Sequence, residues 1–142
     1  MLIYIVSAIV VFGAAFLWIA FTKYKPKTRD ELVDLINNPK FNSGLSQIDT
    51  SRITDMSYLF ARTIPNGQNF PEKIVRRLPD SGFKGIETWD VSNTKNFDFM
   101  FHSCENFDQI LDEWNVRNTK STHCMFEYCY KLKKIPDWYL KA

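Results

Sequence analysis

The sequence predicts an α+β repeat protein, built as a short solenoid of about three 25-residue coils behind a capping helix and an N-terminal transmembrane helix. A motif at 89–93, WDVSN, recurs 25 residues later as WNVRN at 114–118. A fainter copy lies upstream at residues 49–60, and an uncharged stretch covers residues 2–22. Because one coil of a solenoid cannot bury its apolar side alone, a repeat of this length indicates coils that stack on one another.

Residues 2–22 are long and apolar enough to cross a bilayer as one helix. A cleaved signal peptide would need a basic start and a small-x-small cleavage site, yet Phe16, Leu17 and Trp18 occupy the place where small residues are required. A buried core helix is the other alternative, but a domain of this size offers little to cover a helix that is apolar all round. We therefore expect a retained anchor at residues 1–22, in contact with the lipid bilayer through residues 2–22.

The expected localisation is thus a single-pass membrane protein, with the side of the repeat domain left open. Lys23, Lys25, Lys27 and Arg29 all follow the span, and no Lys or Arg precedes it. The positive-inside rule then favours a cytoplasmic domain, although the rule is least reliable when a whole domain follows one span.

Residues 23–44 are predicted to form a linker and a short capping helix. Thr28, followed three residues later by Glu31, is a capping-box pattern for a helix N-terminus. An apolar stripe at helical spacing follows, and residues 37–39 end it. A helix just before a repeat array most simply caps the end of its core. A helix on the membrane surface is disfavoured because anionic lipid would repel its acidic residues, Asp30, Glu31 and Asp34.

Residues 45–142 are predicted to form the solenoid. In each coil a short extended piece carries a Trp and a Val, a polar residue bonds to backbone amides at the turn, and a helical turn directs Phe and Met inward. Two cysteines 25 residues apart are expected to be buried in successive coils, with oxidation of the pair as a secondary alternative. The residues that define the coils are Asp49, Phe60, Trp89, Asp90, Phe101, Cys104, Trp114, Asn115, Phe126 and Cys129.

An insertion interrupts the first repeat. Asp49 and Asp90 are 41 residues apart, 16 more than one period, and the excess falls at about residues 63–81. Three prolines and an Asn-Gly pair predict mainly a loop there. Residues 72–78 could instead form two helical turns, with Pro71 at the first helical position. Insertions in solenoids often lie on the working face. We hypothesise that basic residues of this one contact a partner or anionic lipid; the alternative is a tolerated surface insertion. Those residues are Lys73, Arg76 and Arg77.

Composition argues against several classes of function. A formal net charge of +2 offers no electrostatic case for nucleic-acid binding. The chain has only three cysteines. This number is low, and it is odd, so not all of them could pair in a disulfide-stapled domain. Metal-ligand spacing and a phosphate-binding loop are absent, and no catalytic constellation accompanies the scattered His, Cys and carboxylate residues. We therefore expect no cofactor, no metal site and no enzymatic activity.

The full repeat, W-D-V-S-N-x-x-N-x-x-x-M-F-x-x-C-x-x-F, resembles that of the BspA-like leucine-rich-repeat surface proteins of bacteria. It reads WDVSNTKNFDFMFHSCENF in the second coil and, as a degenerate copy, WNVRNTKSTHCMFEYCYKL in the third. The resemblance extends from about residue 26 to residue 138. It implies a curved, right-handed, leucine-rich-repeat-like solenoid, protein binding and, from the larger members, exposure on the cell surface. It implies no catalytic residues.

The expected function is a membrane-anchored protein-interaction module with an unknown protein partner. Its face would combine the insertion with exposed residues of the extended pieces, namely Glu87, Thr88, Asp112 and Glu113. The alternative is a structural or self-associating envelope component, whose copies meet through the C-terminal end around Ile135 and Trp138. A thiol-based redox or metal protein is the third class.

Overall fold

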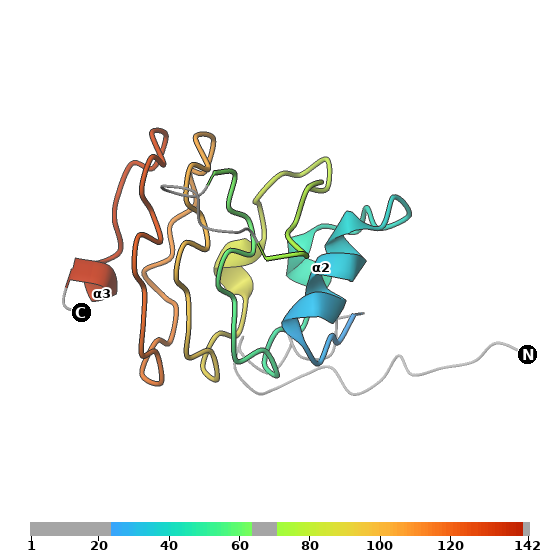
Figure 1. Cartoon of the computed structure of the whole chain (residues 1–142), viewed down its shortest axis with the longest axis horizontal. Helices are drawn as coiled ribbons and strands as arrows, with labels where there is room; N and C mark the ends of the chain where they lie inside the picture. The colour runs from blue at the N-terminus through green and yellow to red at the C-terminus, as the bar shows by residue number, and fades with distance from the viewer. Residues whose placement is uncertain (1–23, 64–70, 141–142) are drawn as a thin grey trace, which may run out of the picture.

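A computed structural model describes residues 24–63 and 71–140 of the chain. In chain order its regular elements are α2 (Arg29–Asn37), the 3₁₀ helix η1 (Leu45–Gln47), the 3₁₀ helix η3 (Ile86–Thr88) and α3 (Asp137–Leu140). Figure 1 shows α2 toward one end of the molecule and α3 at the other, with irregular chain running back and forth between them.

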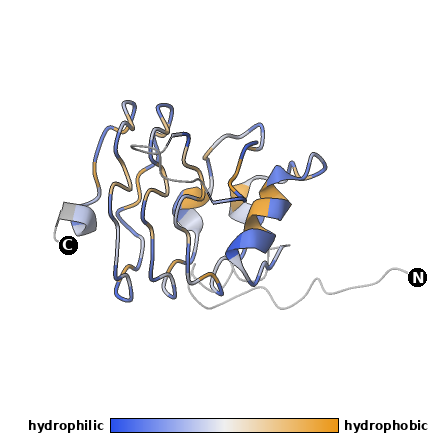
Figure 2. Cartoon of the chain, in the orientation of Figure 1, coloured by the Kyte–Doolittle hydropathy of each residue, from blue (hydrophilic) through white to orange (hydrophobic). Residues whose placement is uncertain are grey.

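The helix α2 begins after Thr28, as the capping-box pattern predicts. The Thr28 hydroxyl accepts a 3.2 Å hydrogen bond from the N–H of Glu31, which satisfies one of the unpaired donors of the first turn. The Glu31 carboxylate reaches back one residue further than the pattern requires and accepts the N–H of Lys27 at 2.7 Å. Figure 2 shows hydrophobic and hydrophilic residues on different sides of this helix. Its buried residues, which join the core, are Leu32, Val33 and Ile36.

Three stretches of chain lie side by side and parallel, joined by two isolated bridges (Figure 1). We call residues 54–62, 95–103 and 120–128 the first, second and third segments. Every second residue of one segment donates its N–H to a carbonyl of the next. Between the first two segments, at 2.8–2.9 Å, the donors are Met56, Tyr58, Phe60 and Arg62. Between the second and third, at 2.8–3.1 Å, they are Phe97, Phe99, Phe101 and Ser103.

The backbone of these segments is not continuously extended. Tyr58, Phe99 and Cys124 occupy equivalent positions, and their φ angles of 56°, 56° and 51° lie in the left-handed region. Ser103 and Tyr128 form a second equivalent pair, with φ of 60° and 59°. Such angles are strained for residues with a Cβ and persist only where the surrounding structure holds them. Here the recurring left-handed residues allow alternate peptide groups to hydrogen-bond across the segments without a regular strand.

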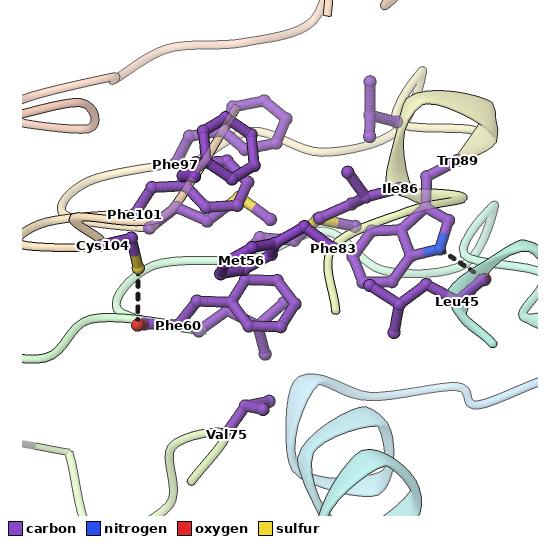
Figure 3. Close-up of a cluster of buried hydrophobic side chains, with 14 of the residues drawn as sticks. Leu45, Met56, Phe60, Val75, Phe83, Ile86, Trp89, Phe97, Phe101 and Cys104 are labelled. Atoms are coloured by element: carbon purple, nitrogen blue, oxygen red, sulfur yellow. Dashed lines mark hydrogen bonds between the residues drawn. The ribbon is translucent and has the colours of Figure 1, made fainter. Parts of the chain in front are cut away.

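Aromatic rings from the three segments form the centre of the core. The ring of Phe101 stacks between those of Phe60 and Phe126, with centroids 5.6 and 5.7 Å apart and planes within 4° of parallel. Phe83 meets Phe60 and Phe107 edge-on, at 5.4 and 5.0 Å. Figure 3 shows Phe60, Phe83 and Phe101 within one cluster. Aromatic pairs of this kind contribute about 0.5–1.5 kcal/mol each beyond the area that they bury.

The described part of the insertion, from residue 71 onward, is packed against the first segment. Val75 is fully buried, and its N–H donates to the carbonyl of Leu59 at 2.8 Å. The Val75 carbonyl accepts the Nη1 of Arg62 at 3.1 Å. Residues 72–78 do not form the two helical turns that the sequence allowed. The backbone of this stretch hydrogen-bonds to the neighbouring segment instead of to itself.

Asn37, the last residue of α2, holds the same stretch from the other side. Its Nδ2 donates to the carbonyl of Ile74 at 2.8 Å, and its Oδ1 accepts the N–H groups of Arg76 and Arg77 at 2.8 and 3.2 Å. One amide side chain thus satisfies three backbone groups. The insertion is therefore a folded layer between α2 and the first segment over these residues.

The predicted α+β leucine-rich-repeat-like solenoid is wrong. Within the described residues there is no strand, only isolated bridges, and no helix in the three segments. The sequence predicted a helical turn that buries Phe97, Met100 and Phe101. These side chains are buried, but the backbone between them turns through a left-handed residue, Phe99, and not through a helix. An apolar spacing of three and four residues therefore identified buried positions but not the backbone conformation that buries them.

The expected single-pass membrane localisation is also corrected. The predicted anchor, residues 2–22, lies outside the described residues. Across residues 24–63 and 71–140, no helix has both the length and the apolar character needed to cross a membrane. Even α2 has only 9 residues, whereas a span requires about 20. The structure therefore supports neither the membrane assignment nor a side, cytoplasmic or cell-surface, for the domain.

Candidate interaction surface

The tryptophans of the two motif copies join successive layers of the core. Trp89 and Trp114 are each 4% exposed. The indole Nε1 of Trp89 donates to the carbonyl of Leu45 at 2.9 Å, and that of Trp114 donates to the carbonyl of Ile86 at 3.2 Å. A buried indole N–H needs such a partner, so these residues have a structural role and present no chemistry to solvent.

The polar residues of the motif hold turns. Oδ1 atoms of Asp49, Asp90 and Asn115 accept the N–H two residues further along, at 3.1, 3.0 and 3.5 Å. These contacts close turns in which a side chain replaces a backbone acceptor. The carboxylates are therefore accounted for by the fold.

Two of the cysteines are buried donors. The Sγ of Cys104 lies 3.0 Å from the carbonyl oxygen of Phe60, and the Sγ of Cys129 lies 3.1 Å from that of Phe101; neither forms a disulfide. Burial raises the pKa of Cys104 to about 12 and that of Cys129 to about 11. Because the thiolate is the reactive form, both side chains are inert at neutral pH. Their packing argues against the redox class.

Cys124 is partly exposed and lies beside a histidine. Its Sγ is 3.3 Å from Nε2 of His123. Burial and a hydrogen bond with Glu127 raise the pKa of Cys124 to about 11. A Cys–His pair in catalysis depends on a lowered thiol pKa, so this arrangement does not favour a nucleophile.

His102 is the most buried ionisable side chain of the second segment, at 1% exposure. Its Nδ1 lies 3.0 Å from the carbonyl oxygen of Thr63, and its Nε2 lies 3.3 Å from Oε2 of Glu127 without the alignment of a hydrogen bond. The ring also packs on Phe99 and Tyr128. We interpret His102 as a packed core residue, since aromatic rings and a backbone carbonyl surround it.

The basic residues of the insertion are engaged within the molecule to different degrees. Nζ of Lys73 forms a 2.7 Å ion pair with Asp34 of α2. Nη1 of Arg77 donates to the carbonyl of Phe41 at 3.3 Å. Arg76 is exposed and bonds through its backbone only. Of the three residues proposed for partner contact, only Arg76 has a side chain without a contact of this kind in the described part of the chain.

The four residues proposed on the extended pieces lie elsewhere. Glu87 and Thr88 belong to η3, where their side chains bond to the N–H and carbonyl of Gly85 at 2.8 and 2.7 Å. Asp112 forms a 2.5 Å ion pair with Lys134. Glu113 is exposed. Lys73 and Arg77 contact α2 and the loop that follows it.

Exposed large apolar side chains fall within one stretch of the chain. In the described part of the chain, large hydrophobic side chains that are exposed all fall between residues 110 and 135: Ile110 (61%), Tyr128 (53%), Tyr130 (73%) and Ile135 (43%). The rings of Tyr128 and Tyr130 are 6.3 Å apart. Ile110 and Ile135 are separated by 25 residues, a spacing that was available in the sequence as a signal.

The fold and this surface define a small protein with an aromatic core, parallel hydrogen-bonded segments and exposed apolar residues toward its C-terminal end. No group of three or more His, Cys, Asp or Glu in residues 24–63 and 71–140 could hold a metal ion. The chain belongs to the family described as Mycoplasma protein of unknown function, DUF285, whose sequence model matches residues 29–77 and 79–142.

That family description contains no BspA or leucine-rich-repeat name. The expected BspA-like membership is therefore wrong, and the expectation of a bacterial surface protein loses the resemblance on which it rested. No curated protein and no solved structure matches the chain.

Proposed function

We propose that this chain is a non-catalytic protein-binding module that contacts its partner through exposed apolar residues near its C-terminal end. One observation carries the proposal: the exposed large hydrophobic side chains of the described residues are confined to residues 110–135. Scattered surface hydrophobics are ordinary, whereas a group of them confined to one stretch of the chain favours an interaction site. Tyrosine is also enriched at the centres of protein interfaces.

The structural roles of several polar and sulfur-containing side chains support the same proposal. The buried thiols have raised pKa values, the turn carboxylates accept backbone N–H groups, and His102 is packed among aromatic rings. These side chains thus have structural partners within the fold. Five of the seven residues first proposed as an interaction face have side chains that bond within the molecule, so the exposed apolar residues are the better candidates.

The test is site-specific photo-crosslinking in cells. A photoreactive amino acid is placed at Tyr130 or Ile135, with Lys40 and Arg52, both exposed, as matched control positions. We expect a discrete crosslinked protein from the first two positions and none from the controls. Tyr128→Ser with Ile110→Ser should remove the crosslink while leaving the thermal unfolding midpoint nearly unchanged, because both side chains are exposed. Equal crosslinking from all four positions would refute the proposal.

The alternative function is self-association through the C-terminal end. It is favoured by the exposure of Ile135, but α3 already covers part of that end: Trp138 stacks on Trp114 at 6.3 Å and donates its Nε1 to the carbonyl of Leu111 at 2.8 Å. Sedimentation of the purified chain distinguishes the two functions. A strict monomer rejects self-association, whereas a crosslink from Ile135 to a second copy in a sedimenting dimer establishes it.

A further inference from the structure

The imidazole of His102 contacts the chain on both sides of the second segment. Its Nδ1 lies 3.0 Å from the carbonyl oxygen of Thr63, the residue that follows the first segment. Its Nε2 lies 3.3 Å from Oε2 of Glu127 on the third segment. The ring also packs on Phe99 and Tyr128, with centroids 5.5 and 5.4 Å away. With 1% of His102 exposed, its contacts with the neighbouring chain determine which protons the ring holds.

The contact with Thr63 places a proton on Nδ1. A carbonyl oxygen can only accept a hydrogen bond, so Nδ1 is the donor at 3.0 Å. The hydroxyls of Thr63 and Ser103 lie further from Nδ1, at 3.4 and 3.2 Å, and are 2.5 Å from each other. Without a proton on Nδ1, two acceptors would face each other at the shortest polar contact of the ring. Nδ1 therefore carries a proton in the folded chain.

The surroundings of Nε2 favour a second proton. In a neutral ring with its proton on Nδ1, Nε2 presents a lone pair and can only accept. This nitrogen is buried, has no hydrogen-bond partner within the described residues, and lies 3.3 Å from a carboxylate oxygen of Glu127. Two acceptors at this distance repel each other, and an unsatisfied buried nitrogen costs free energy. A proton on Nε2 replaces the repulsion by the attraction of an imidazolium and a carboxylate.

The other titratable groups packed around this pair do not supply that charge. Burial and a hydrogen bond with Glu127 raise the pKa of Cys124 to about 11, so its thiol is neutral at physiological pH. Tyr128 contributes an aromatic ring at 85° to the imidazole. Arg62 donates its N–H to the carbonyl of His102 at 2.9 Å, but its guanidinium donates to a carbonyl of the insertion at 3.1 Å. The positive charge beside Glu127 therefore has to come from His102.

We propose that His102 and Glu127 form a pH-sensitive clamp between the second and third segments. Imidazole changes its charge between about pH 5 and 8. Below this range the imidazolium holds the carboxylate of Glu127 inward. As pH rises through it, the proton on Nε2 passes to solvent, and the Glu127 side chain, which is 49% exposed, turns toward water.

The clamp lies directly behind Tyr128, one of the exposed apolar residues. Tyr128 follows Glu127 in the chain, packs on the imidazole and has a left-handed φ of 59°. A residue in this strained conformation depends on its surroundings to hold it. Release of Glu127 should therefore loosen the backbone and ring of Tyr128 at the same pH. The clamp itself is independent of the proposed function, and only its effect on partner binding rests on that function.

The direct test is a pH titration of the full chain by NMR. At pH 5.5 both ring nitrogens of His102 should carry protons, as read from their nitrogen chemical shifts. As pH rises to 8.5, Nε2 should lose its proton, and the signals of Tyr128 should change with the same midpoint. The chain has only one other histidine, the exposed His123, and His123→Gln should preserve the response. A His102 ring that is neutral at pH 5.5 or still charged at pH 8.5, or Tyr128 signals that do not follow it, would overturn the inference.

Glu127→Gln provides the second test, because an amide N–H of Gln can donate to the bare Nε2 and so satisfy a neutral ring. In the unsubstituted chain the thermal unfolding midpoint should fall by about 3–6 °C between pH 5.5 and 8, since the charged ring stabilises the folded state only while it keeps its proton. Glu127→Gln should remove most of this fall, and Glu113→Gln, at an exposed residue, should retain it. An equal fall in the unsubstituted and Glu127→Gln chains would refute the clamp. A working clamp in a chain that gives no crosslink from Tyr130 would reject the proposed function alone.

Discussion

Trp89 donates its indole N–H to the carbonyl oxygen of Leu45, 44 residues earlier in the chain, at 2.9 Å (Figure 3). The same carbonyl accepts the N–H of Ile48 at 3.1 Å. The indole thus joins the motif at residues 89–93 to η1, a 3₁₀ helix beside the core. Because both groups are buried, water cannot replace the bond if the indole is removed.

Trp89→Phe should lower the free energy of unfolding by about 1–3 kcal/mol. The variant loses one buried hydrogen bond and part of a ring, while the Leu45 carbonyl keeps its bond from Ile48. Urea unfolding followed by circular dichroism measures the change. Trp138→Phe is the control and should cost less, because that indole is only partly buried and water can reach its acceptor. Equal losses in the two variants would show that burial does not set the strength of these bonds.

Asn37→Ala should destabilise the chain by about 1–3 kcal/mol, because one amide side chain serves three backbone groups of residues 74–77. The variant should also make residues 71–78 the first site of cleavage by a protease of broad specificity. Asn106→Ala, at an exposed residue, is the matched control and should change stability by less than about 0.5 kcal/mol. Unchanged stability and unchanged cleavage in Asn37→Ala would contradict the conclusion that this part of the insertion is a folded layer.

The two buried thiols should resist alkylation in the folded chain. With the pKa of Cys104 raised to about 12 and that of Cys129 to about 11, the thiolate fraction at pH 8 is very small. Iodoacetamide labelling at pH 8, read by mass spectrometry, should modify both only after denaturation. Rapid labelling of either thiol in the folded chain would show that its burial is transient.

The same pKa values predict a loss of stability in alkali. The folded thiols ionise above their ordinary value of 9.0, so the unfolded chain loses these protons first as pH rises. Their contribution to stability is full below about pH 9 and is lost as pH rises through about 11–12. Cys104→Ala with Cys129→Ala should flatten the fall in unfolding free energy above pH 9, measured by urea titration at each pH. A slope unchanged by the double substitution would exclude the thiols as its source.

Much of the core was predictable because spacing and burial go together. The large apolar residues of the motif copies, among them Phe101 and Phe126, are buried and stack on one another. The N-cap at Thr28 was also predictable, since a capping hydroxyl acts on an amide three residues away and needs no distant partner. Of the exposed apolar residues that carry the proposed function, only Ile135 was singled out from the sequence, because exposure depends on what covers a side chain and not on its type.

The sequence by itself determined which residues are large and apolar, where they recur and where α2 begins, since these are local properties of residue type and spacing. Only the tertiary structure decided the backbone between them. The left-handed angles of Phe99 and Cys124 are strained in isolation and persist because hydrogen bonds to adjacent segments hold them. Likewise, only contact with Leu59 and Asn37 places the insertion inside the fold. Partners so far apart in the chain leave no local pattern, so spacing predicted the buried positions but not the backbone conformation that buries them.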